Sequence, residues 1–264
     1  MRPASAILMT IGIGLMTGCV ATPKTSYRAD LQAVEQAQPN RNPILILVWL
    51  DQTPSRYSNG VPQATVVDFE PLLRVLEQNG GELAVGAIRD MSNRPLIRCH
   101  FDEPPISNAQ EPDRTANVFV RQQATKKYAR ALHDDVARVT EWLERNAKLR
   151  SECRTALSNA VAKTSDAPRT DMNGALLRTK LLLDEPQTSW SLPPQRYAVM
   201  ITDGIGNVNG PAPDSLGETK LLIVNSAGSL GTLEGLRPLR FESIAAAFRF
   251  VLDDSAVLRQ TEGR

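Results

Sequence analysis

The chain has 264 residues, which is long enough for one large domain with a hydrophobic core of its own. Its hydrophobic content of 42% and its charged content of 22% are ordinary for a globular protein. The formal net charge is only +1, so the charge balance gives no indication of nucleic acid as a partner, and we expect none.

The first 18 residues have the features of a secretory signal peptide. Arg2 is followed by an apolar stretch over 6–16 and then by Thr17-Gly18-Cys19. Residues 16–19 closely resemble a bacterial lipobox, which implies that Cys19 becomes the lipidated first residue of the mature protein. Val20 after the cysteine implies the outer membrane, facing the periplasm of a bacterial cell envelope. The alternatives are a short membrane anchor or a chance apolar start, although the run is too short to span a bilayer.

Residues 19–42 are rich in Ala, Gln, Pro, Thr and Asn and have little periodic apolar content. We therefore predict a flexible tether between the lipid anchor and the folded domain.

The segment 43–55 reads PILILVWLDQTPS and contains an unbroken apolar run that ends at Asp51. Such a run with β-branched members is typical of a strand buried on both faces, as in a parallel sheet. Thr53 and Ser55 follow Asp51 at alternate positions, just beyond the carboxyl end of this strand. In parallel sheets that edge is where ligands bind.

The next elements predict an alternation of helix and strand. Residues 66–78 have helical spacing of apolar side chains, and 82–89 form a second strand. A turn at 90–94 leads to a third strand at 95–101, and so short a connection requires antiparallel pairing at a sheet edge.

A long helical stretch at about 115–163 follows the acidic, proline-bearing loop 102–113. Its length without caps predicts a break into two helices. We interpret its apolar stripe as a packing surface, and the alternative is a partner-binding arm. Together, residues of about 103–164 form a helical insertion.

The remaining elements continue the alternation. We expect a helix at 170–183, strands at 195–202, 221–225 and 239–241, a closing helix at 242–252, and a frayed tail at 256–264. The whole pattern over 43–255 predicts a doubly wound α/β domain, with a mostly parallel central sheet flanked by helices.

Two acidic residues, Asp51 and Asp203, end buried strands of this predicted sheet. If those strands are neighbours where the strand order reverses, both carboxylates face one crevice. Thr53, Ser55 and Thr170 can add three neutral oxygens. Such an oxygen-only set suits a hard cation, with Mg²⁺ expected first and Mn²⁺ or Ca²⁺ as alternatives. The competing interpretation is that these side chains only cap helices and turns.

Three segments of the chain then carry a family resemblance. They are Asp51-Gln52-Thr53-Pro54-Ser55, Thr170-Asp171 before a helix containing Ala175-Leu176, and Ile201-Thr202-Asp203-Gly204. In this order they resemble the metal-ion-dependent adhesion site of a von Willebrand factor A domain, over about 42–252. Thr53 in place of the usual Ser, Pro54 and the helical insertion depart from the family pattern. The resemblance implies that Asp51, Thr53, Ser55, Thr170 and Asp203 hold a cation that captures a carboxylate of a protein partner.

An enzyme is the alternative function, namely a magnesium-dependent phosphotransferase or hydrolase on a similar α/β fold. Phosphotransferases of the haloacid dehalogenase type also begin with an aspartate at a strand end, but they need a second one where Thr53 stands. Residues 204–210 (GIGNVNG) lack the following helix of a dinucleotide fingerprint. His100 and His133 are expected to be structural or solvated, so no catalytic residue is predicted.

Cys99 and Cys153 are the two cysteines that remain besides Cys19. In an oxidising compartment they can form a disulfide that joins the third strand to the helical insertion. The alternative is two separate buried thiols.

Overall fold

The computed structural model describes residues 42–92, 96–113, 115, 117–163, 168–186, 190–206, 208, 210–224 and 230–261. In chain order its elements are β1 (Ile44–Asp51), α2 (Ser55–Ser58), α3 (Val66–Asn79), β2 (Gly81–Ile88), β3 (Ile97–Phe101), α4 (Val118–Val161), α5 (Met172–Leu183), β4 (Gln195–Ile201), β5 (Lys220–Val224), the 3₁₀ helix η1 (Gly231–Leu236), β6 (Leu239–Phe241) and α6 (Ile244–Thr261). The predicted signal peptide, Cys19 and all of the tether before Asn42 lie outside the described residues.

The six strands form one sheet in the order β3-β2-β1-β4-β5-β6. Each neighbouring pair is parallel except β2 and β3, which pair antiparallel as the short connection predicts. The prediction of a mostly parallel α/β sheet flanked by helices is therefore confirmed. The strand order reverses at β1, because β2 lies on one side of it and β4 on the other.

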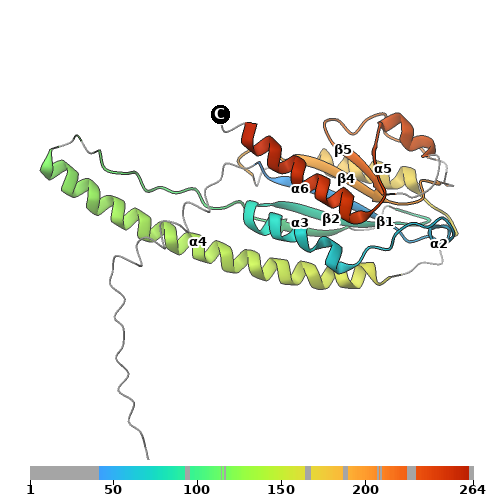
Figure 1. The fold of residues 1–264 in the computed structure, drawn as a ribbon, viewed down its shortest axis with the longest axis horizontal. Helices are drawn as coiled ribbons and strands as arrows, with labels where there is room; N and C mark the ends of the chain where they lie inside the picture. The colour runs from blue at the N-terminus through green and yellow to red at the C-terminus, as the bar shows by residue number, and fades with distance from the viewer. Residues whose placement is uncertain are drawn as a thin grey trace, which may run out of the picture.

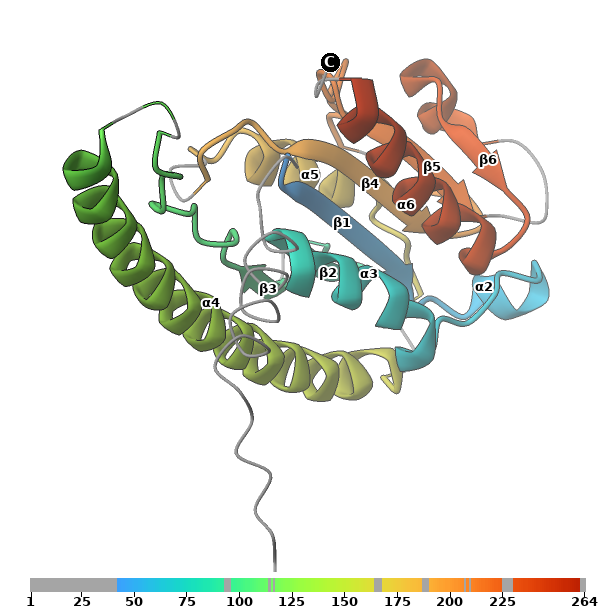
Figure 2. The same cartoon turned by 60° about the vertical axis from the view of Figure 1, so that its left-hand side comes forward.

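Helices cover both faces of this sheet (Figures 1 and 2). Side chains of α3, α6 and the C-terminal half of α4 form a core with one face, and α5 and η1 pack on the other. All eight residues of β1 are buried as a result. Alternate residues of β1 enter the two cores, so Val48 belongs to one core and Trp49 to the other. This explains why the strand is continuously apolar.

The long stretch after β3 is one uninterrupted helix of 44 residues, so the predicted break into two helices is wrong. Its sequence contains no Gly or Pro and is rich in Ala, Leu, Arg, Lys and Glu, which favour the helical conformation throughout. Tertiary contacts stabilise its second half along the sheet edge. Trp142 Nε1 donates to the Asp102 carbonyl at 2.9 Å near one end of the sheet, and Gln52 Nε2 donates to the Ala160 carbonyl at 3.2 Å near the other.

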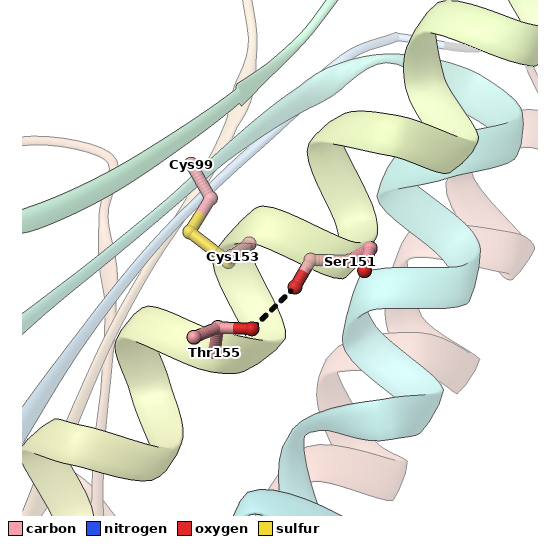
Figure 3. The surroundings of a disulfide bond; sticks show 4 residues. All are labelled: Cys99, Ser151, Cys153 and Thr155. Carbon is pink, nitrogen blue, oxygen red and sulfur yellow. Dashed lines mark hydrogen bonds between the residues drawn. A yellow bond between two sulfur atoms is a disulfide. The ribbon is translucent and has the colours of Figure 1, made fainter.

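Two kinds of bond fasten this second half of α4 to the domain. Arg150 forms ion pairs with Glu70 and Glu77 of α3, at 2.9 and 3.0 Å. Cys99 of β3 and Cys153 of α4 form a disulfide that closes a sequence separation of 54 (Figure 3). Of the two alternatives for these cysteines, the structure therefore contains the bridge.

The first half of α4 is attached to the loop 102–113 through Asp135, which is 2% exposed. Its Oδ2 accepts hydrogen bonds from Ser107 Oγ, the Asn108 amide and the Ala109 amide at 2.6, 3.0 and 3.2 Å. Burial opposes ionisation of this carboxyl, but the bonds from Ser107, Arg138 and Ala109 outweigh it, so the pKa of Asp135 is lowered. The loop and the first half of the helix therefore form one unit beside the sheet.

The closing helix is longer than predicted, because α6 continues to Thr261 instead of fraying after Asp253. Asp254 fixes this extension, since its carboxylate accepts hydrogen bonds from Tyr197 Oη of β4 at 2.7 Å and from Lys220 Nζ of β5 at 2.6 Å. The sequence pattern could not reveal these long-range partners. Across the part of the chain that the structure describes, no helix is both long and apolar enough to cross a membrane.

Candidate metal centre

The two aspartates of the predicted site lie at the carboxyl ends of neighbouring strands. Asp51 ends β1, and Asp203 comes two residues after β4, whose Ile201 pairs with Leu50 of β1. Both side chains are 1% exposed. The sequence prediction required the two strands to be adjacent where the strand order reverses, and the sheet has this arrangement.

Asp51 is held by three hydrogen bonds to its carboxylate. Oδ1 accepts from the Thr53 amide at 2.9 Å and from Thr53 Oγ1 at 2.6 Å, and Oδ2 accepts from Thr202 Oγ1 at 2.8 Å. Burial raises the pKa of Asp51, these hydrogen bonds oppose the rise, and the negative charge of nearby Asp203 adds to it. The net result is a raised pKa for Asp51, with burial as the largest cause.

Three hydroxyls gather beside this carboxylate. Thr53 Oγ1 lies 3.1 Å from Ser55 Oγ and 3.3 Å from Thr170 Oγ1, although Thr170 is 117 residues away in the sequence. Thr53 and Thr170 are each 2% exposed, whereas Ser55 is half-buried and stands at the solvent side of the cluster. The structure thus brings Asp51 and the three predicted hydroxyls into one connected group.

Thr170 is positioned by the residue that follows it. The Asp171 amide donates to the Arg89 carbonyl at the end of β2, and the Asp171 side chain accepts from the Gly174 amide as the N-cap of α5. Ser92 binds the same residue twice, through its amide at 3.1 Å and its hydroxyl at 2.7 Å. These bonds fix the start of α5 against the loop after β2.

Asp203 belongs to the same crevice but forms different bonds. Its Oδ2 accepts from Asn59 Nδ2 at 2.9 Å, and its Oδ1 accepts from the Ile205 amide at 2.9 Å. Asn59 caps the short helix α2, so the loop after β1 reaches across to the end of β4. Asp203 lies close enough to Asp51 for its negative charge to raise the pKa of Asp51.

The donor spacing can be compared with the needs of a hard cation. Adjacent ligands of an octahedral magnesium ion with bonds of about 2.1 Å lie about 3 Å apart. The Thr53–Ser55, Thr53–Thr170 and Thr53–Asp51 oxygen distances of 3.1, 3.3 and 2.6 Å are close to this value. Among the described residues, no cluster of three or more His, Cys, Asp or Glu could hold a metal. A cation here would therefore depend on hydroxyls as well as on two carboxylates.

Sequence reasoning missed four side chains that support the site. Thr202 donates a hydrogen bond to Asp51, and Asn59 donates one to Asp203. The sequence features that could have indicated these two residues are the ITDG segment and the Asn59-Gly60 turn. Gln52 accepts from Arg89 Nε at 2.9 Å, and buried Arg56 donates through Nη1 to the Asp51 carbonyl at 2.7 Å. Both contacts join residues whose proximity depends on how the loops fold back.

The surface around the site is apolar and shallow. Tyr57 of α2 and the loop residues Met91 and Ile205 lie at this edge of the sheet and are 57%, 53% and 52% exposed. The cavity lined by Asp51 and Arg56 has a volume of about 10 Å³, which is room for about one water molecule. A larger cavity of about 190 Å³ lies next to it and is lined by Gln52, Arg89 and Ala160.

Comparison with known proteins adds no relative to these observations. No model of a known protein family matches this chain, and no curated protein matches it either.

Proposed function

We propose that this chain is a von Willebrand factor A-like binding module with α4 as a helical insertion. In this proposal Asp51, Thr53, Ser55, Thr170 and Asp203 hold a divalent cation, with Mg²⁺ expected first and Mn²⁺ or Ca²⁺ as alternatives. The site then captures an acidic group of a protein partner. The observation that carries the proposal is the connected cluster of Asp51, Thr53, Ser55 and Thr170, which joins segments 117 residues apart at the edge where β1 and β4 end.

The charge balance of the cluster favours an anionic partner group. Asp51 and Asp203 can only neutralise a divalent ion, and the three hydroxyls contribute no charge that would repel an incoming carboxylate. A bound cation would supply a positive centre in a largely buried crevice, where charges interact more strongly than in water. The half-buried Ser55 marks the side from which a partner can approach.

The surroundings favour a protein over a small molecule. Exposed aromatic and Met side chains are enriched at protein interfaces, and Tyr57, Met91 and Ile205 form such a rim. The cavity beside Asp51, of about 10 Å³, is too small to enclose a phosphate ester. The rim therefore favours capture of a protein partner as the proposed activity.

Calorimetric titration with Mg²⁺, Mn²⁺ and Ca²⁺ tests the metal site. We expect saturable binding to the wild-type chain, and Thr170→Val should weaken it about tenfold or more, because even groups that only orient metal ligands cost about that much. Thr155→Val, which removes an exposed hydroxyl on α4, is the matched control and should bind like the wild type. Equal affinities for all three proteins would contradict the proposal.

Partner capture completes the test. The immobilised chain is incubated with envelope extract, with and without a chelator, and with a glutamate-containing peptide as competitor. A protein retained only with metal and displaced by the peptide supports carboxylate capture. Turnover of a phosphate ester with Mg²⁺, lost in Thr170→Val, would instead support the enzymatic alternative.

We also propose that Cys19 anchors the chain to the envelope membrane, on the basis of the sequence at 16–19. Cys19→Ser should leave the protein without lipid and release it from the membrane fraction in a high-salt wash, because salt screens electrostatic contacts that could still hold the chain on anionic lipids. Mass spectrometry and washed membrane pellets measure both effects. A variant that stays in the washed pellet would show that the anchor is something other than an acylated Cys19.

A further inference from the structure

The first half of α4 projects past the sheet on the side away from the candidate metal centre (Figure 1). Asp102, which follows β3, accepts the bond from Trp142, and Phe101 lies level with Gly81 and Ile44 at the start of β1. Residues 118–141 therefore extend beyond the edge where β1 begins. At 1.5 Å per residue this arm is about 36 Å long. Asn42, the first described residue, lies at the same edge.

The tip of the arm, defined here as residues 118–130, carries exposed apolar side chains at its end. Val118, Phe119 and Val120 are 55%, 81% and 52% exposed. Consecutive helical residues point about 100° apart, so these three form an apolar cap around the helix end and not a stripe for packing along another helix.

Basic residues surround this cap without acidic residues on the same stretch of helix. Arg121, Lys126, Lys127 and Arg130 are all exposed, and residues 117–133 contain no Asp or Glu. Within the described ranges, none of the four forms an ion pair. Glu111 and Asp113 on the adjoining loop lie on the side of Lys127 and Tyr128. Lys126 and Arg130 have the helical spacing that places them on the same face of the helix as Phe119. These two charges and the Phe119 ring therefore lie on one side of the tip.

We propose that the tip of the arm docks on a phospholipid bilayer that contains anionic lipids. Phe119 and its apolar neighbours enter the interface while Arg121, Lys126 and Arg130 contact the headgroups, a combination typical of interfacial helices. Lys127 lies on the side of Glu111 and Asp113. The position of the N-terminus supports this partner, because the chain leaves the domain at the edge from which the arm projects. Residues 19–42 can span at most roughly 80–85 Å when extended, which exceeds the length of the arm. Docking would direct the candidate metal centre away from the membrane, and it does not depend on whether metal binds.

A tryptophan in place of Phe119 tests the proposal in the full chain. Vesicles of phosphatidylethanolamine and phosphatidylglycerol should shift the emission of the Phe119→Trp protein to shorter wavelength, and brominated lipids should quench it. Phosphatidylcholine vesicles should do neither. The native residues Trp49, Trp142 and Trp190 are 1%, 3% and 7% exposed and give a constant background. The emission of the introduced tryptophan reports on the tip itself. The result therefore does not depend on how the N-terminal part of the chain attaches to the membrane.

Charge variants of the same reporter protein test the role of the cations. Lys126→Gln with Arg130→Gln should lower the ratio of docked to free tip about 25-fold, at about fivefold for each charge. Lys148→Gln with Lys163→Gln is the matched control, because Lys148 lies on the half of α4 along the sheet and Lys163 follows the end of that half. It should leave docking unchanged.

Four outcomes would overturn the proposal. One is no shift with anionic vesicles, and another is an equal shift with phosphatidylcholine. The third is an equal shift for Val67→Trp, a reporter that is 66% exposed on α3 near the metal-site end. The fourth is a shift without vesicles that grows with protein concentration, which would assign the tip to a second copy of the chain.

Discussion

Replacing Cys99 and Cys153 together with alanine should lower the free energy of unfolding by about 4 kcal/mol. This value follows from the loop entropy of a cross-link that closes a sequence separation of 54. Alanine is preferred to serine because both positions are buried, at 7% and 5% exposed, and a hydroxyl there would add a cost of its own. Urea unfolding followed by circular dichroism measures the change.

Local stability should fall first in α4. The bridge joins the C-terminal part of that helix to the edge strand β3, where ion pairs of Arg150 and Arg154 with α3 also hold it. Hydrogen exchange should therefore quicken in α4 before it does in β1 or β4. Reduced wild-type protein should match the double variant, and a reducing agent should not affect the variant further. Equal stability of oxidised and reduced wild type would show that the bridge contributes nothing.

The parts of the fold that the sequence predicts are those determined by local pattern. The continuous apolar run of β1 reports burial on both faces, and the short β2–β3 connection leaves only antiparallel pairing. The places of Asp51 and Asp203 follow from the ends of those strands. A few neighbouring residues are enough to show where a buried strand ends, so a carboxylate at that position can be found from the sequence.

The parts that the sequence does not predict depend on contacts between distant residues. In α4, side chains such as Trp142 and Asn146 bond to the carbonyls of Asp102 and Glu77, and these contacts stabilise the helix along the sheet edge. The extra length of α6 depends on Asp254 meeting Lys220. The local sequence around α4 and α6 does not show which distant residues these helices contact. Only the folded structure shows these contacts.

Supporting residues of the candidate site were missed for a related reason. Thr202 and Asn59 are ordinary polar residues near a strand end and in a turn, and their value comes from bonding to Asp51 and Asp203. The hydroxyl of Thr170 could be predicted as a ligand only through a family resemblance. Its own local pattern, a Thr-Asp pair before a helix, is equally typical of an N-cap, and Asp171 does serve as that cap.

Asp51→Asn should separate the stability of the domain from its response to metal. Without metal, Asp51 and Asp203 are two carboxylates near one another, each 1% exposed, and burial together with the charge of Asp203 disfavours the ionised form of Asp51. An asparagine keeps the shape and removes one charge. Its oxygen can accept from Thr53, and its amide can donate to the Thr202 hydroxyl. We therefore expect the metal-free variant to unfold at the same temperature as the wild type or higher.

Saturating Mg²⁺ should reverse this order. A ligand at 100 times its dissociation constant stabilises the folded state by about 2.7 kcal/mol. For a domain of this size that corresponds to a rise of about 5–10 °C in the midpoint of unfolding. Wild-type protein should show the rise, and a chelator should remove it. Asp51→Asn should show none, because the cation loses one of only two carboxylates.

Asp254→Asn is the matched control for this experiment. Its carboxylate is bonded to Lys220 and Tyr197 far from the crevice, so the variant should unfold at a lower temperature and still gain stability from Mg²⁺. An equal gain in wild type and Asp51→Asn would place any cation elsewhere on the molecule. If Asp51→Asn stabilises the metal-free fold and also abolishes the stabilisation by Mg²⁺, the Asp51 carboxylate serves cation binding and not folding. Two buried carboxylates close together are costly, and in the proposed function a divalent ion held by Asp51 and Asp203 offsets that cost.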